Sequence, residues 1–103
     1  MSKLKAAFIF ISPNPDNEST EKWCSWTHTA GVDLLSIGVA SYKEGVEAAK
    51  KAVAEHGCGA IELCGGFGLR GAAEVAAAVK VPVGVVRFDV HPGLGNVSGD
   101  TVF

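Results

Sequence analysis

The chain has 103 residues, of which 48% are hydrophobic and 19% charged, so it is long enough for one domain with a single core and too short for two. Its formal net charge of −2, without a Lys/Arg cluster, excludes the basic surface of a nucleic-acid-binding protein. No apolar stretch approaches the roughly 20 residues of a membrane span. Three cysteines without a close pair favour a reducing compartment. We expect one cytoplasmic domain over residues 1–103, with no nucleic-acid or membrane partner.

The first part of the chain predicts a strand, a turn and a helix. Residues 4–11 are almost continuously apolar, which is typical of a central strand covered on both faces. Residues 12–17 read Ser-Pro-Asn-Pro-Asp-Asn and predict a turn. A helix with an aromatic inner face is expected to end at Gly31. This helix is predicted because Trp23, Trp26, Thr27 and Ala30 recur at the spacing of one helix face. The two tryptophans are candidates for core packing or for lining a pocket.

A second strand is predicted over residues 32–39, nearer the edge of the sheet because it is more polar than the first. Ser41 and Glu44 have the spacing of a capping box. The helix that they introduce has one apolar face and is expected to stop at Gly57.

The second half of the chain continues the alternation. Residues 59–64 predict a third strand, residues 71–80 a helix of small side chains, and residues 83–88 a fourth strand after a boundary at Pro82. The tail from residue 89 onward is a glycine-rich loop.

Strands that alternate with helices imply parallel strands joined by right-handed crossovers. We therefore predict an α/β fold, a small three-layer sandwich with a four-stranded parallel sheet in the order 2-1-3-4. Ligands of such sheets bind outside the carboxyl ends of the strands, where the winding reverses. This point lies between strands one and three. It gathers Ser12, Asn14, residues 64–68, Arg87, Asp89 and His91.

Residues 66–71 read Gly-Phe-Gly-Leu-Arg-Gly, a GxGxxG pattern between a strand and a helix. With Asp89 after the next strand, this is the context of a dinucleotide fingerprint, although the chain lacks a second mononucleotide half. The Lys-Ser/Thr pair of a Walker A loop is absent. We expect the turn to hold a small anionic group, with nucleotide binding and a purely structural turn as alternatives. The expected ligand-binding residues are Ser12, Asn14, Gly65, Gly66, Phe67, Gly68 and Arg87.

Glu62, Cys64, Asp89 and His91 are the candidate catalytic residues. In a covered strand, Glu62 needs either a partner such as Arg87 or a raised pKa, so a structural ion pair and a catalytic acid are both open. Cys64 lies near a helix N-terminus, where a thiol pKa is lowered, yet free cysteines are often merely buried. His91 suits proton transfer near neutral pH, or a hydrogen bond that organises its loop.

Metal and cobalamin chemistry are not expected. A zinc site formed by His56, Cys58 and Cys64 fails because six residues of strand separate the cysteines by about 20 Å. The Asp-x-His segment at residues 89–91 lacks the glycine of a cobalamin signature, because Leu94 stands there. The sequence identifies no cofactor.

Two motifs carry a family resemblance. Residues 62–68 read Glu-Leu-Cys-Gly-Gly-Phe-Gly, and residues 89–95 read Asp-Val-His-Pro-Gly-Leu-Gly, followed by Ser-Gly-Asp at residues 98–100. Together they resemble an uncharacterised family of small bacterial α/β proteins, a domain of unknown function. The resemblance covers nearly the whole chain and implies a fold and a site, but no activity.

Two functions from different classes follow from the sequence. The leading hypothesis is binding of a small anionic molecule at residues 65–71, and whether catalysis accompanies it is open. The alternative is a homo-oligomeric assembly module without chemistry, in which residues 92–103 pack on a neighbouring subunit.

Overall fold

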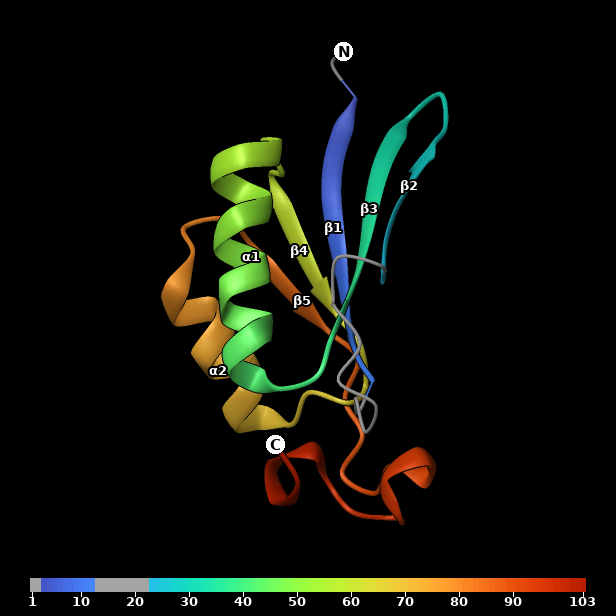
Figure 1. Ribbon diagram of the computed structural model, residues 1–103, viewed down its shortest axis with the longest axis vertical. Coiled ribbons are helices and arrows are strands. Elements are labelled where there is room, and N and C mark those ends of the chain that lie inside the picture. The colour runs from blue at the N-terminus through green and yellow to red at the C-terminus, as the bar shows by residue number, and fades with distance from the viewer. Residues whose placement is uncertain (1–2, 13–22) are drawn as a thin grey trace.

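The computed structural model describes residues 3–12 and 23–103. In these parts of the chain, five strands form one mixed sheet in the order β2-β3-β1-β4-β5, with two helices beside it (Figure 1). The elements are β1 Leu4–Ile11, β2 Cys24–His28, β3 Val32–Val39, α1 Tyr42–His56, β4 Ala60–Leu63, α2 Leu69–Ala78 and β5 Val83–Val85, followed by the short 3-10 turns η2 Pro92–Leu94 and η3 Gly99–Thr101. None of the described helices is long and apolar enough to cross a membrane.

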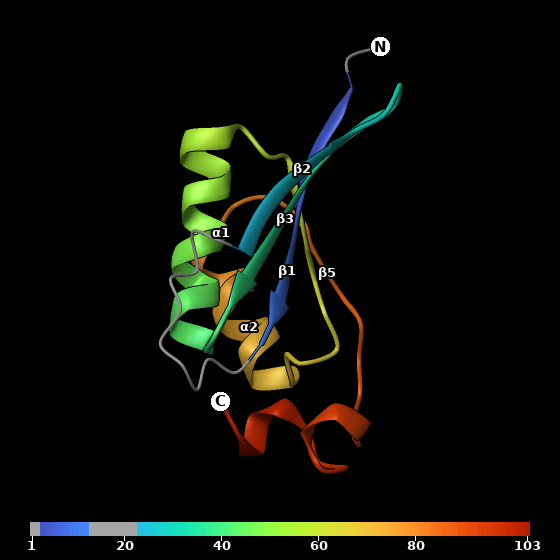
Figure 2. The ribbon, with the colours of Figure 1, turned by 45° about the vertical axis from the view of Figure 1, so that its right-hand side comes forward.

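Four adjacent strands, β3, β1, β4 and β5, run parallel to one another. The predicted order 2-1-3-4 is therefore confirmed for the parallel strands. The crossovers through α1 and α2 both move in the same direction across the sheet. Right-handed crossovers in one direction place their helices on the same face, as Figure 2 shows.

The segment that was expected to form a helix before Gly31 is instead β2, which pairs antiparallel with β3. Trp26 lies opposite Leu35 in this hairpin, and Thr29 closes its turn by bonding to Val32. Tryptophan and threonine favour strands, so pairing with β3 overrides a helical spacing. A helix between β1 and β3 would have crossed in the opposite direction and covered the other face. The predicted four strands and three layers are thus corrected to five strands and two layers in the described residues.

Alternation along β1 divides the sheet into two faces. Ala7 and Ile9 are fully buried beneath the helices, whereas Phe8 and Phe10 point away from them and are half-buried. Among the described residues, helices therefore cover β1 on one face only, where the sequence predicted a cover on both. We call the side without helices the uncovered face. Its strand residues are Leu4, Ala6, Phe8, Phe10, Ser25, Thr27, Val32, Leu34, Ser36, Gly38, Ala60, Glu62 and Gly84.

The predicted helix that begins after Ser41 is confirmed as α1. The Ser41 hydroxyl accepts the N–H of Glu44 at 3.2 Å, and the Glu44 carboxylate accepts the N–H of Ala40. Gly57 ends the helix with φ 69°, and its N–H bonds to the carbonyl of Ala52. The core lies between this helix, α2 and the sheet. It includes Leu35, Ile37, Val39, Tyr42, Ala49, Ile61, Leu63, Phe67 and Val75.

Candidate functional site

The predicted anion-binding turn uses its own backbone N–H groups inside the chain. The N–H of Gly66 points at the sulfur of Cys64 at 3.2 Å, and the N–H of Phe67 bonds to the Cys64 carbonyl at 3.1 Å. The N–H of Gly68 donates to the Tyr42 hydroxyl at 2.9 Å. At Gly65, an added side chain would collide with the ring of Phe88 rather than meet open space.

Asp100 occupies the N-terminus of α2, where the sequence placed an external anion. Its two carboxylate oxygens accept the N–H of Arg70 at 3.1 and 3.2 Å, and one oxygen accepts the N–H of Gly71 at 3.4 Å. The Tyr42 hydroxyl donates to the same carboxylate at 2.9 Å. Because a helix N-terminus favours negative charge, the C-terminal tail supplies the capping group that α2 otherwise lacks.

The ionisation of Tyr42 and Asp100 reflects this contact. Burial raises the pKa of Tyr42 to about 12, and the neighbouring Asp100 carboxylate also raises it. Partial burial raises the pKa of Asp100, but hydrogen bonds from Arg70 and Tyr42 lower it by more, so its pKa lies below the ordinary value. Tyr42 is therefore a neutral donor and Asp100 an anionic acceptor near neutral pH.

The tail packs on its own chain. The Phe103 ring lies 6.0 Å from that of Tyr42 and packs against the core. A side chain at Gly99 would collide with the Gly66 carbonyl oxygen, so the tail and the glycine turn are in close contact. Gly99 and Phe103 therefore contact their own chain, and the packing of residues 92–103 on a neighbouring subunit stays a prediction.

Cys64 lies at the junction of β1 and β4, as its place at the end of a strand predicted. Its sulfur accepts N–H groups from Ile11 at 3.3 Å and Gly66 at 3.2 Å, and the side chain is half-buried against the core. Ser12 is tied to the adjacent strand end through its N–H, which donates to the Val39 carbonyl at 2.8 Å. Asn14 lies outside the described residues.

Glu62 and Arg87 do not form the expected pair. Glu62 is exposed on the uncovered face, in register with Phe8, so the premise of a covered acid is wrong. Arg87 instead bonds to Asp89 at 3.1 Å, and both side chains are mostly exposed. Exposed pairs of this kind contribute little to stability.

His91 organises the loop that leads into η2. Its Nδ1 accepts the N–H of Gly93 at 3.0 Å, and its ring lies 4.8 Å from that of Phe88. No hydrogen bond or ion pair among the described residues joins Cys64 to Glu62, Asp89 or His91. A shared catalytic role of these four residues stays a prediction.

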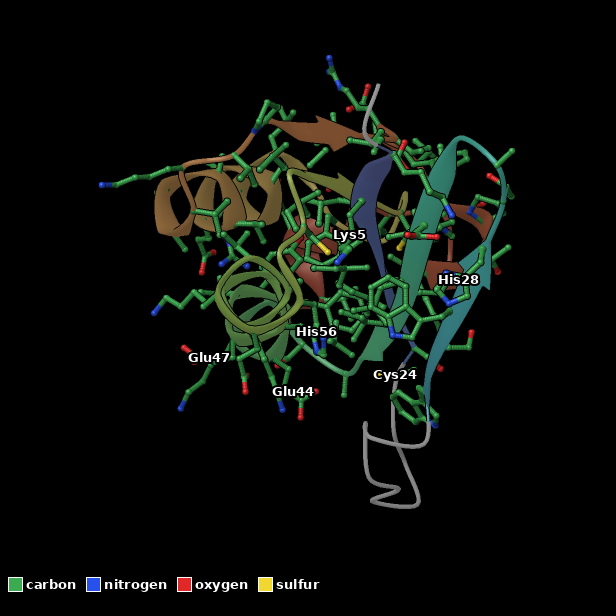
Figure 3. The ribbon with its side chains drawn as sticks, turned by 90° about the horizontal axis from the view of Figure 1, so that it is seen from above. Lys5, Cys24, His28, Glu44, Glu47 and His56 are labelled. Carbon is green, nitrogen blue, oxygen red and sulfur yellow. The ribbon has the colours of Figure 1, made fainter. Side chains whose placement is uncertain are left out.

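A groove of about 1010 Å³ opens between α1 and the β2–β3 hairpin on the helix side of the sheet. It exists because two helices, each roughly 10 Å wide, do not cover the full width of five strands. Leu35, Ile37 and Val39 form its apolar floor. Figure 3 shows His56 on α1 and Cys24 on β2 on opposite sides of the groove. The charged groove residues of α1 are Lys43, Glu44, Glu47, Lys50, Lys51 and Glu55.

An aromatic cluster forms the hairpin side of this groove. Trp26 is 38% exposed and stacks on His28, with ring centroids 5.6 Å apart and an interplanar angle of 7°. His56 meets the same indole nearly at right angles, at 5.9 Å. Asp33 holds His28 through a 2.7 Å contact to Nδ1 and bonds to Lys3 at 2.7 Å. Hydrogen bonds from Lys3 and then His28 lower the pKa of Asp33.

Sequence reasoning missed this groove because it placed Trp26 on a helix. The one available signal was the pair of tryptophans, which were candidates to line a pocket, and Trp26 does line this one. Neither His56 nor the hairpin partner Leu35 could be assigned to the groove without knowing that residues 24–28 form a strand.

The fold and these sites define an α/β domain with two helices on one face of a mixed sheet, a tail that caps α2, and a groove beside α1. The chain belongs to the family of unknown function DUF6506, whose model matches residues 4–101. The expected resemblance to an uncharacterised domain family is thus confirmed. No curated protein and no solved structure matches the chain.

Proposed function

We propose that this domain binds a small molecule with a flat apolar ring in the groove between α1 and β2. The observation that carries this proposal is the half-exposed indole of Trp26 above an apolar floor in a groove of about 1010 Å³. Small-molecule sites combine such apolar and aromatic walls with a few polar groups and have volumes of roughly 300–1,000 Å³. His56 and the lysines of α1 supply polar groups at the rim.

The glycine turn supports an external ligand less well than the groove does. The N–H groups of Gly66 and Gly68 already have acceptors, and Asp100 takes those of Arg70 and Gly71. An external anion would have to displace the Asp100 carboxylate from these N–H groups. A dinucleotide is larger than a simple anion, so it would have to displace the same carboxylate and occupy more of the surrounding surface. We therefore place the proposed ligand in the groove rather than at the glycine turn that the sequence predicted.

Binding of the fluorescent anion 8-anilino-1-naphthalenesulfonate tests the groove. Ala48 lines the groove from α1, so Ala48→Phe should fill it and weaken binding about tenfold, or about 1.4 kcal/mol. Ala76→Phe is the matched control, because Ala76 is an exposed alanine of α2 outside the groove. Amide shifts on titration should concentrate in β2 and α1. Equal binding by both variants would refute the proposal.

A second candidate function is the binding of an anionic ligand at the N-terminus of α2, where the ligand would displace the Asp100 carboxylate. The observation that favours it is that a carboxylate already binds the Arg70 and Gly71 N–H groups. Cys64, whose sulfur accepts the N–H of Gly66 in the preceding turn, would be the candidate nucleophile of this site.

Chemical rescue tests this second candidate. In Asp100→Ala, added acetate or phosphate should shift the Arg70 and Gly71 amide resonances and raise the melting temperature, whereas the wild-type protein should respond weakly. Asp89→Ala, which removes an exposed carboxylate elsewhere, should behave as the wild type does. Absence of any anion response in Asp100→Ala would leave the turn as a purely structural element.

A further inference from the structure

The uncovered face is apolar along both of its long strands. Leu4, Phe8 and Phe10 of β1 lie there beside Val32 and Leu34 of β3. Leu4 is 49% exposed, and the other four side chains are half-buried in the single chain. Sheets in stable domains are usually covered on their apolar faces by a second layer. Among the described residues, helices form that layer on the other face only, and on the uncovered face the Trp23 side chain lies against Gly38.

One row of side chains crosses this face at the level of Phe8. By strand register, Ser36 lies beside Phe8 on β3, and Glu62 lies beside it on β4. Each neighbour is about 4.8 Å away, which is the spacing between strands. Among the described strand residues, Glu62 is the one charged side chain on the uncovered face. Whatever covers this face must therefore give the Glu62 carboxylate a hydrogen-bond donor.

We propose that a second copy of this chain covers the uncovered face, with the two sheets packed face to face about a two-fold axis parallel to the strands at Phe8. Such an axis sets β3 of one copy opposite β4 of the other and places the two Phe8 rings in contact. The Glu62 carboxylate then lies opposite the Ser36 hydroxyl of the second copy, which donates to it on both sides of the axis.

The direction of the axis follows from charge. A two-fold axis perpendicular to the strands would set β4 opposite β4 and bring the two Glu62 carboxylates toward each other. Like charges in a desolvated interface repel, whereas the axis parallel to the strands pairs each carboxylate with a hydroxyl. Face-to-face sheets pack about 10 Å apart, a gap that a glutamate and a serine side chain can bridge with one hydrogen bond.

The size of the face approaches that of a dimer interface. The two eight-residue strands β1 and β3 extend about 26 Å, and β2, β4 and β5 are shorter, so the strands give a flat footprint of about 440 Å². Specific interfaces bury roughly 600–1,000 Å² per partner, and protruding side chains add to the flat footprint. The groove lies on the opposite face, so this inference is independent of the proposed ligand site.

Light scattering coupled to size exclusion and sedimentation equilibrium test the dimer. The wild-type protein should have twice the 10.6 kDa mass of the chain. Phe8→Glu should be monomeric, with an unchanged far-ultraviolet circular dichroism spectrum. Leu69→Glu is the matched control, because Leu69 is 59% exposed on α2, and it should remain dimeric. A monomeric wild type, or a folded Phe8→Glu that dimerises as the control does, would overturn the proposal.

A double-mutant cycle tests the direction of the two-fold axis through the pairing of Glu62 with Ser36 of the second copy. This test does not depend on whether Phe8→Glu folds. Glu62→Gln and Ser36→Ala should each weaken dimerisation about tenfold, and the double variant should be no weaker than either single variant. Additive losses, or tighter association of Glu62→Gln, would contradict the pairing of these residues across the interface.

Discussion

The hydroxyl of Tyr42 and the carboxylate of Asp100, 58 residues apart, form a 2.9 Å hydrogen bond above the first turn of α2. Tyr42 begins α1, and Asp100 belongs to η3 in the tail. Through Gly68 and Arg70, both groups also bond to the backbone at the start of α2. Three segments that are distant in the sequence are therefore held at one point, and the first predictions concern this point.

Removal of the Asp100 carboxylate should destabilise the protein. Asp100→Ala leaves the N–H groups of Arg70 and Gly71 without their acceptor, and loss of a helix cap costs about 1–2 kcal/mol. Urea unfolding at neutral pH measures this change. Asp89→Ala removes only an exposed ion pair and should change the free energy of unfolding by about 0.5 kcal/mol or less. Equal effects of the two substitutions would contradict a capping role.

The contribution of Asp100 should disappear in acid. Its folded pKa lies below the ordinary value of 3.8, so the contribution is fully present above that value and is lost as the pH falls through the folded pKa. The difference in unfolding free energy between wild type and Asp100→Ala should therefore be constant from neutral pH down to about pH 5 and shrink below about pH 4. A difference that is independent of pH would argue against the ionised carboxylate as the capping group.

Tyr42 should ionise at unusually high pH. It is the one tyrosine in the chain, so the phenolate absorbance reports this residue alone. We expect a midpoint near pH 12 in the folded protein and near pH 10 in urea. The pKa of Tyr42 is higher in the folded protein than in the unfolded protein. The contribution of the neutral hydroxyl to folding stability is therefore fully present below about pH 10 and is lost between about pH 10 and pH 12. A folded midpoint at the ordinary value would show that the hydroxyl is solvated.

The contact between the tail and the glycine turn should not tolerate a methyl group. Gly99→Ala places its Cβ against the carbonyl oxygen of Gly66, a rigid backbone atom, and should destabilise the protein by about 1–3 kcal/mol. Gly31→Ala is the control, because an added Cβ there meets no atom within 4 Å. Chemical unfolding of both variants is the measurement. A neutral Gly99→Ala would mean that the tail is not seated on the turn in solution.

The sequence predicted the parallel part of the sheet because its signals are local. The apolar runs of β1 and β4, and the capping pair Ser41 and Glu44 before α1, each act within a few residues. The error at β2 arose because the spacing of Trp23 and Trp26 fits a helix, and the pairing with β3 that overrides it is a tertiary interaction.

That single error also explains the missing third layer. A helix between β1 and β3 would have covered the face on which Phe8 and Glu62 now lie. The role of Asp100 was beyond local reasoning for another reason. No short pattern connects a tail carboxylate to the N–H groups of a helix about 30 residues earlier in the chain.

The β2–β3 hairpin has a consequence for how the chain folds. Among the described strands, it is the one antiparallel pairing and joins its two strands by a short turn, whereas the consecutive strands β4 and β5 are joined through α2; hairpins form within microseconds. The central strand β1, by contrast, must find β3 and β4 across long intervening segments, and such non-local pairings slow folding. We expect the hairpin to form early and to present β3 as the template on which β1 docks, so that substitutions in the hairpin turn change the folding rate more than the unfolding rate.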